Sequence, residues 1–425
     1  MSVLDRVETI CWRTWMVQAS GFALLAVLLI ATLISASVEA AGLPCFYAAV
    51  VDYAPRNVTA DGGATRGLQP ALFLEAPTTA AFFAYTALVL FCMAMCNVAI
   101  PATIRREGQR SRALRRSIVA LASMTSPPAA LFLGALLAWT LQTVVLCLSH
   151  KLVSLSAVLY VCHACLLVPF FVYYCGAGMP RAAYVGLADT VKYNSPRLYI
   201  LLHYSRAINA NLLGGALALG IGVAPLMLGQ LMATGLQMAF WRTIAGAITM
   251  FAVCAIVYLV SAELVFSHYV QMLVGPAFGI LVAAGCMGVS LNDYSARLAP
   301  VIAACAPNLP LAVRVTLAAV GLFAALMLVV RLVRAYLYHR RKNSAFYGRV
   351  TKVRRRAARY VQRVRKARGR GRDADAEPLF DSDGFGGAGE GDGDDAYEVP
   401  DDEEPVYEEP AAYQKRPTPR SYTQY

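Results

Sequence analysis

Charged side chains are scarce over the first 330 residues of this chain. Only 15% of the 425 residues are charged, whereas 58% are apolar, and a soluble protein usually carries about 25% charged residues. The first 330 residues hold 18 of the 38 Lys and Arg and 10 of the 26 Asp and Glu. An apolar surface of that size would aggregate in water. The scarcity of charge therefore excludes a soluble globular protein and favours a protein that crosses a membrane several times.

Sequence patterns typical of metal sites and active sites are also missing. No Cys or His spacing typical of zinc ligands occurs; Cys162, His163 and Cys165 lie within one apolar run and have no second pair. The chain contains no recognisable nucleophile–base pair, no glycine-rich phosphate loop and no paired carboxylates within an apolar run. The sequence therefore predicts a protein that is not an enzyme and that has no cofactor and no metal site.

The apolar residues gather in eight stretches that are long enough to form membrane-spanning helices, each of which needs about 20 apolar residues. They are residues 15–38, 79–104, 129–148, 152–175, 207–231, 243–266, 270–291 and 311–333. Residues 214–222 (GGALALGIG) have small side chains that allow close helix packing. The predicted fold is an all-α integral membrane protein: a polytopic bundle of eight transmembrane helices within residues 15–338, followed by a disordered cytoplasmic tail.

Positive charge in the short loops predicts the orientation of this bundle, because Lys and Arg are retained on the cytoplasmic side. Residues 105–116 contain six Arg, so this loop is predicted to be cytoplasmic. Residues 176–206 and the segment after residue 333 are also basic and fall on the same side. We therefore expect a cytoplasmic N-terminus (residues 1–14), a cytoplasmic C-terminus and one large lumenal loop, residues 39–78.

The first apolar stretch has an alternative interpretation as a cleaved signal peptide. Arg6 and Arg13 precede it, and residues 35–40 (SASVEA) contain small side chains at a spacing typical of cleavage sites. The apolar run is about 20 residues long, whereas a signal peptide has about 7 to 15, which favours a retained helix. Cleavage would leave a seven-helix, receptor-like protein, although the Asp-Arg-Tyr and Asn-Pro-x-x-Tyr motifs of such receptors are absent.

The predicted lumenal loop contains two modification sites. Asn57-Val58-Thr59 is a sequon for N-glycosylation. Cys45 lies in the same loop, in an oxidising compartment where a lone thiol tends to pair. The residues leave two pairings open: an intramolecular bridge to Cys305, the other predicted lumenal cysteine, or a disulfide to a separate partner.

Ionisable side chains are nearly absent from the predicted helices, whereas transporters and channels need them at membrane depth. His163 is the one titratable group near the middle of a helix, and a hydrogen-bonded packing role is favoured over a proton or ligand site. Glu263 and Arg314 lie near helix ends, where their side chains can reach the interface. The polar residues expected to link helices by hydrogen bonds are Asn97, Gln142, Asn209 and Gln230.

The C-terminal residues form two zones of opposite charge. Residues 339–372 are basic and are predicted to lie on the anionic membrane surface, rather than on nucleic acid. Residues 373–425 are acidic, contain several tyrosines and are predicted to be disordered. The candidate sorting motifs are the Tyr-x-x-hydrophobic pattern from Tyr347 to Val350 and an acidic, tyrosine-flanked group: Tyr397, Asp401, Asp402, Glu403, Glu404 and Tyr407.

Several separated sequence blocks resemble one viral family. These are LPCFYA (43–48), SHKLVSLSAVLYVCHACLLV (149–168), SHYVQMLVGP (267–276), RAYLYHRR (334–341) and PVYEE (405–409). In this order they resemble the herpesvirus envelope glycoprotein M family, and the tail is similar to that of its alphaherpesvirus members.

The resemblance implies eight membrane helices with both ends cytoplasmic and a heterodimer with envelope glycoprotein N. It implies that Cys45 forms the interchain disulfide, which favours a separate partner over Cys305. The family acts in secondary envelopment, brings other envelope proteins to the trans-Golgi network and modulates membrane fusion. The implied locations are the virion membrane and the host Golgi, endosomal and inner nuclear membranes. The tail would then bind cytoplasmic sorting adaptors and tegument proteins.

Overall fold

The part of the chain described by the computed structural model consists of helices and short connections. It comprises residues 3–37, 76–107, 119–120, 122, 126–150, 152–176, 191–193, 196–236, 238, 240–266, 273–288 and 306–341. Within these residues there is no β-strand. The long helices are α1 (Val3–Ser37), α3 (Ala76–Glu107), α5 (Pro128–Ser149), α6 (Val153–Gly176), α8 (Pro196–Gly235), α9 (Phe240–Leu264) and α11 (Leu309–Arg341). A shorter apolar helix, Gly275–Gly288, lies between α9 and α11 in the sequence.

Each of the eight predicted apolar stretches overlaps with one of these helices. Among the described residues, seven helices are long and apolar enough to cross a membrane. The remaining stretch, 270–291, which is the seventh along the chain, is described as helical only over Gly275–Gly288. The structure therefore confirms an all-helical membrane-type fold with seven candidate spans, and the eighth span stays a prediction.

Several helices extend beyond the ends of the apolar stretches that predict them. Helix α1 begins at Val3, so most of the predicted N-terminal segment 1–14 is helical; α8 begins at Pro196 and α11 continues to Arg341. Hydropathy marks only the apolar part of a helix, whereas backbone hydrogen bonds continue the helix through polar residues. Helix α5 begins at Pro128, within the Pro-Pro pair where its start was expected, because proline is favoured in the first turn of a helix.

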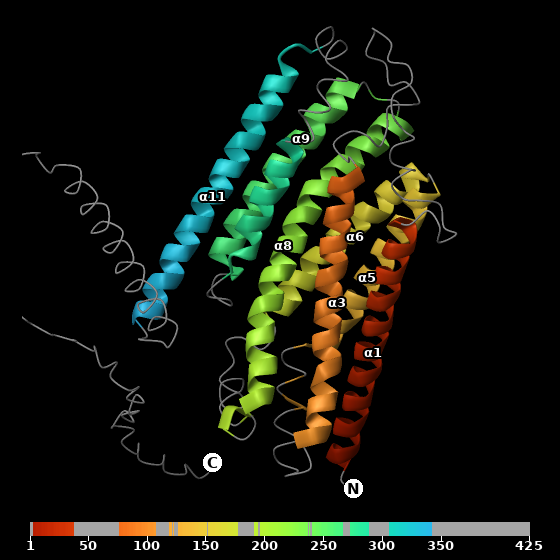
Figure 1. The fold of residues 1–425 in the computed structure, drawn as a ribbon, viewed down its shortest axis with the longest axis vertical. Helices are drawn as coiled ribbons and strands as arrows, with labels where there is room; N and C mark the ends of the chain where they lie inside the picture. The colour runs from red at the N-terminus through yellow and green to blue at the C-terminus, as the bar shows by residue number, and fades with distance from the viewer. Residues whose placement is uncertain are drawn as a thin grey trace, which may run out of the picture. The chain divides into compact units, whose positions relative to one another are not determined.

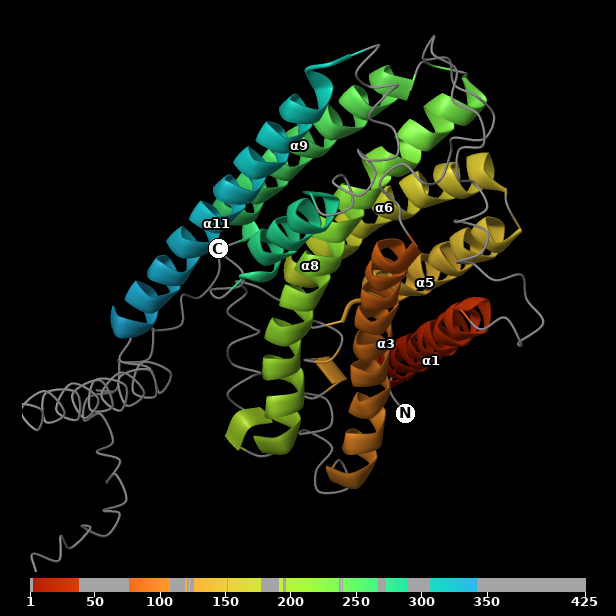
Figure 2. The same ribbon diagram turned by 45° about the horizontal axis from the view of Figure 1, so that its top comes forward.

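Five helices form a closed ring, and two more long helices extend it on one side. Helix α1 packs on α5, α5 on α6, α6 on α8, α8 on α3, and α3 returns to α1. Helix α9 packs against α8 on the other side, and α11 packs against α9. Figures 1 and 2 both show α3 between α1 and α8, with α11 beyond α9. Helix α8 therefore connects the ring to the outer helices.

Helix α1 is an integral part of the ring. Trp15, Phe22 and Leu29 on one of its faces are fully buried. The indole Nε1 of Trp15 donates a hydrogen bond of 2.8 Å to the carbonyl oxygen of Ser126. A Cβ at Gly134 on α5 would lie 2.8 Å from the Phe22 ring, so a glycine makes room for that ring.

The short helix Gly275–Gly288 packs directly against α8 because both carry small residues at the contact. A Cβ at Gly275 would lie 1.9 Å from the carbonyl oxygen of Asn211, and a Cβ at Gly279 would lie 2.6 Å from the Cβ of Ala218. Further along, Met287 and Ala283 contact Gly222. The contacts advance in the same direction on both helices, so the helices are parallel. The glycine-rich segment of α8 thus serves close packing, as the sequence predicts.

Candidate functional site

The residues of the predicted disulfide, the predicted glycosylation site and the candidate sorting motifs lie outside the described residues. They are Cys45, Asn57, Cys305, Tyr347, Val350, Tyr397, Asp401, Asp402, Glu403, Glu404 and Tyr407. The geometry of the described part instead concerns the polar groups inside the helical bundle. Eight cysteines of the described helices are free thiols: Cys92, Cys96, Cys147, Cys162, Cys165, Cys175, Cys254 and Cys286.

His163 on α6 lies in the core of the bundle and its side chain is fully buried. Its Nδ1 is 3.0 Å from the hydroxyl oxygen of Thr140 on α5. That hydroxyl also lies 3.0 Å from the carbonyl oxygen of Leu137. Because a threonine hydroxyl has a single proton, donation to Leu137 leaves it to accept from Nδ1. This arrangement puts a proton on Nδ1 of His163.

The second nitrogen of the imidazole has a different environment. Nε2 of His163 is buried and has no hydrogen-bond partner among the described residues. The imidazole ring instead lies beside the ring of Tyr160, with centroids 5.7 Å apart, and Tyr160 lies against Phe83 of α3. His163 therefore has the hydrogen bond expected of a packing histidine on one side and an aromatic contact on the other.

His163 does not belong to a metal site in the described structure. Cys162 and Cys165, its neighbours in sequence, are exposed on the outer side of α6. No group of three or more His, Cys, Asp or Glu side chains that would hold a metal ion occurs in the described ranges. The described part of the bundle thus provides neither a metal centre nor a carboxylate partner for His163.

Two of the four polar residues predicted to link helices are confirmed in that role. The side-chain amide of Gln142 on α5 donates to the hydroxyl of Thr32 on α1 at 3.0 Å. Asn209 on α8 is hydrogen-bonded to the side chain of Tyr174 on α6. The other two, Asn97 on α3 and Gln230 on α8, are buried in the bundle.

Other linking residues were not predicted, because their roles depend on the packing of distant helices. Tyr258 on α9 donates from its hydroxyl to the carbonyl oxygen of Gly214 at 2.8 Å. Arg206 on α8 donates to the carbonyl oxygen of Cys175 on α6 at 2.8 Å. The side-chain oxygen of Asn211 accepts from the backbone N–H groups of Val274 and Gly275 at 2.7 and 2.9 Å. Asn211 thereby caps the start of the short helix.

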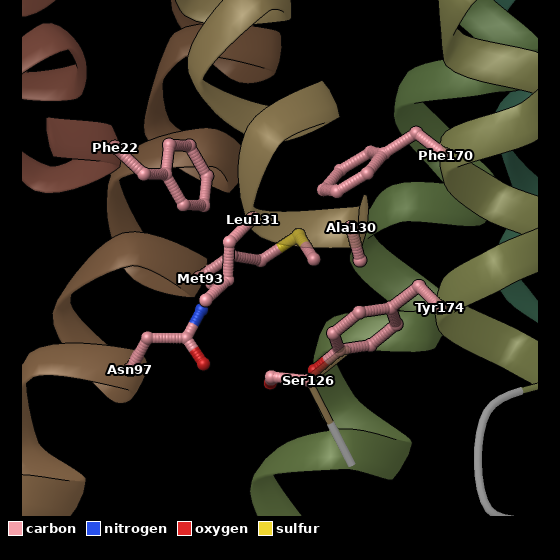
Figure 3. A pocket seen from close by; sticks show the side chains of 8 residues that line it. All are labelled: Phe22, Met93, Asn97, Ser126, Ala130, Leu131, Phe170 and Tyr174. Atoms are coloured by element: carbon pink, nitrogen blue, oxygen red, sulfur yellow. The ribbon is translucent and has the colours of Figure 1, made fainter. Parts of the chain in front are cut away.

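A small pocket lies between α1, α3, α5 and α6. It has no room for a water-sized molecule and is lined by Phe22, Met93, Asn97, Ser126, Ala130, Leu131, Phe170 and Tyr174. Figure 3 shows Asn97, Ser126 and Tyr174 on one side of it and the rings of Phe22 and Phe170 on the other. Pockets that bind small molecules usually have about 300 to 1,000 Å³. This pocket is therefore a gap in helix packing and not a site of small-molecule size.

Three charged side chains lie together in the C-terminal parts of α9 and α11. We call Glu263, Arg331 and Arg334 the α9–α11 charge cluster. Glu263 contacts Nη1 of Arg334 through one carboxylate oxygen and lies 3.6 Å from Nη1 of Arg331 through the other. The side chain of Arg331 is 5% exposed, that of Glu263 13% and that of Arg334 55%. Glu263 was expected to reach the interface as a single charge, but the structure places it in an ion pair. Arg314, by contrast, is exposed.

These observations together define a polytopic helical membrane protein whose described interior is connected by hydrogen bonds and aromatic packing. The model of the family described as herpesvirus glycoprotein M matches residues 8–350 of the chain. The chain therefore belongs to the herpesvirus glycoprotein M family. No solved structure matches it.

Individual relatives extend this match over most of the chain. The envelope glycoprotein M of bovine herpesvirus 1.1 (strain Cooper) is 49% identical over 363 residues, which cover 84% of this chain and 83% of the relative. The envelope glycoprotein M of varicella-zoster virus (strain Dumas) is 39% identical, with 85% and 84% covered. That of human herpesvirus 1 (strain 17) is 32% identical, with 84% and 74% covered. All three are similar to this chain over more than four fifths of its length.

Proposed function

We propose that this protein is a non-enzymatic scaffold of the viral envelope that pairs with envelope glycoprotein N. In this role it brings envelope components together during secondary envelopment and modulates membrane fusion. The observation that carries the proposal is the similarity to several proteins named envelope glycoprotein M over more than four fifths of the chain. The proposed locations are the virion membrane and the host Golgi, endosomal and inner nuclear membranes.

The interior of the bundle supports a scaffold over a transporter. Transport of ions or protons requires ionisable groups with partners at membrane depth. In the described helices, His163 is the titratable group near a helix centre, and its contacts are a threonine hydroxyl and an aromatic ring. The ion-paired Glu263 is the second-last residue of α9, and its partners Arg331 and Arg334 lie in the last third of α11.

The proposed topology has eight membrane helices, both termini in the cytoplasm and a disordered acidic tail. The parallel packing of the short helix Gly275–Gly288 and α8 supports it. Helix α9 lies between them in the sequence, so an eight-helix path gives α8 and the seventh segment, 270–291, the same direction. The cytoplasmic tail then carries the candidate sorting residues for adaptors and tegument proteins.

The packing of α1 argues against the seven-helix receptor. Cleavage near Ala40 would remove Trp15, Phe22 and Leu29 from the core and break the hydrogen bond from Trp15 to Ser126. Mass spectrometry of the N-terminal peptide of the mature protein tests this point. We expect a peptide from the start of α1; a mature chain that begins near residue 41 would revive the receptor.

The proposed bond to glycoprotein N is tested on non-reducing gels of infected-cell protein. We expect a small partner to migrate with the wild-type protein and to separate from it in Cys45→Ser. The matched control, Cys305→Ser, keeps the complex. Persistence of the covalent complex in Cys45→Ser would contradict the assignment of the bond to Cys45, and its loss in Cys305→Ser would assign the bond to Cys305. A wild-type protein without a covalent partner would point to an intramolecular bridge between the two cysteines.

A shift in gel mobility tests the proposed glycan. Digestion with an N-glycosidase is expected to increase the mobility of the wild-type protein and to leave that of Asn57→Gln unchanged. An equal change in both would show that the glycan is attached elsewhere.

A further inference from the structure

The α9–α11 charge cluster has more positive than negative charge. Glu263 provides one carboxylate, whereas Arg331 and Arg334 provide two guanidinium groups, and both contact that carboxylate. The cluster therefore has a net charge of about +1, because arginine stays protonated in proteins. Such an excess of positive charge is costly in apolar surroundings, because the free-energy cost of an uncompensated charge rises as the dielectric constant falls.

The side chains around Arg334 are apolar and exposed. Val330 and Leu337 lie one turn before and one turn after it on the same face of α11, and both are exposed. On α9, Leu264 directly follows Glu263 and is also exposed. Apolar side chains on the surface of a membrane protein face lipid chains. Arg334, with its side chain 55% exposed, therefore lies within this lipid-facing surface, near the C-terminal end of α11.

We propose that the α9–α11 charge cluster binds the phosphate of an anionic phospholipid in the cytoplasmic leaflet. The proposal rests on the proposed orientation, in which the ends of α9 and α11 are cytoplasmic. The exposed guanidinium of Arg334 binds the phosphate oxygens, and the buried Arg331 holds Glu263 beneath it. A guanidinium presents paired N–H donors that match phosphate oxygens in a bidentate arrangement.

The chemistry of the cluster favours a lipid with a net negative charge. One such lipid supplies the single negative charge that the three side chains lack. The exposed Val330, Leu337 and Leu264 provide an apolar surface for its acyl chains. A zwitterionic lipid has the phosphate but not the net charge, and free phosphate has the charge but no acyl chains. The cluster is therefore expected to bind an anionic lipid more tightly than a zwitterionic lipid or free phosphate.

Thermal unfolding of the purified full-length protein in a neutral detergent tests the proposal. The midpoint is measured against increasing dioctanoyl phosphatidylglycerol, dioctanoyl phosphatidylcholine or inorganic phosphate. For the wild type we expect a saturable rise with phosphatidylglycerol and none with the other two. In Arg334→Gln the half-saturating concentration rises roughly fivefold, the change expected for one basic residue at an anionic surface. Arg334→Lys keeps the positive charge but loses the paired N–H donors of the guanidinium. Its half-saturating concentration is expected to lie between those of the wild type and Arg334→Gln.

Two further variants separate a lipid site from a simple ion pair. Arg340→Gln removes an exposed arginine from the same end of α11 but outside the cluster, and we expect the wild-type response. Glu263→Gln raises the charge excess of the cluster, so the half-saturating concentration falls even if the protein itself becomes less stable. Because the variants of Glu263 and Arg334 keep all the basic residues 339–372, and Arg340→Gln removes only one of them, differences among the variants report on the cluster.

Three results would overturn the proposal. The first is an unchanged half-saturating concentration in Arg334→Gln, or an equal loss in Arg340→Gln. The second is weaker binding of phosphatidylglycerol in Glu263→Gln. The third is an equal rise with phosphatidylcholine or with inorganic phosphate, which would show that the anionic lipid is not the preferred occupant. The location of the termini, measured separately, tests the orientation itself.

Discussion

At the scale of single residues, the bundle core depends on a few polar contacts between helices. The contact between His163 and Thr140 joins α6 to α5 with a hydrogen bond of 3.0 Å inside a fully buried environment. Such bonds between membrane helices stabilise by about 0.6 to 2 kcal/mol. The imidazole also fills space beside Tyr160. His163 therefore contributes both a hydrogen bond and packing volume.

Replacement of this histidine is expected to lower the stability of the bundle, and the scaffold account predicts no transport activity that the replacement could abolish. His163→Ala removes the bond and leaves a cavity, so the thermal unfolding midpoint in detergent falls, with a loss of about 2 to 4 kcal/mol. Cys162→Ser, on the exposed side of the same helix, serves as the control and changes stability little. Substrate or proton flux in proteoliposomes that is present in the wild type and lost in His163→Ala would contradict the scaffold.

The glycines of the short helix provide a matched pair for a second prediction. In Gly275→Ala the new Cβ meets the carbonyl oxygen of Asn211, whereas in Gly285→Ala it meets nothing within 4 Å. We expect Gly275→Ala to displace the short helix from α8 and to lower the folded fraction in size-exclusion chromatography. Gly285→Ala should be neutral or slightly stabilising, by up to about 1 kcal/mol. Equal behaviour of the two variants would show that the close contact at Asn211 is wrong.

At the scale of helices, α11 is the least buried of the long helices. Its buried apolar side chains form one narrow stripe, and the wider face is exposed: Val313, Leu317, Val320, Ala324 and, near the C-terminal end, the small Ala335. Near its C-terminal end, the buried Arg331 pairs with Glu263 of α9. The attachment of this end of α11 therefore depends on the charge cluster more than on apolar packing.

Removal of the buried arginine is expected to release the end of α11. Arg331→Ala leaves part of the charge of Glu263 uncompensated, and loss of one partner from a buried pair costs about 3 to 5 kcal/mol; the partly exposed Arg334 reduces that cost here. Amide hydrogen exchange over residues 331–341 should become at least about tenfold faster. Arg340→Ala is the control and leaves the exchange unchanged. Equal exchange in both variants would contradict a role for the pair.

The positions of the helices could be predicted from the sequence, but their ends and partners could not. Apolar length alone located a helix in every one of the eight stretches, because a membrane-spanning helix needs a continuous apolar surface. The starts of α1 at Val3 and of α8 at Pro196 fall in polar sequence that hydropathy does not mark. Helix packing brings Thr140 to His163 and Arg331 to Glu263, and no spacing in the sequence reveals it.

At the scale of the whole molecule, the helices form a bundle whose predicted functional groups lie at its periphery. The glycan, the disulfide and the sorting motifs are predicted in the lumenal loop and in the tail, whereas the described interior holds the helices together. The match of the family model to residues 8–350 covers the helical region. This arrangement agrees with the proposed scaffold.

The location of the two termini tests this account most directly, since an even number of spans puts them on the same side. Epitope tags are placed at both ends of the full-length protein, and antibody access is compared in cells with a permeabilised plasma membrane and in cells with all membranes permeabilised. The account predicts that both tags are reached in the first condition, whereas a tag inserted between residues 60 and 65 is reached only in the second. Access to one terminal tag but not to the other under the first condition would contradict the eight-helix scaffold.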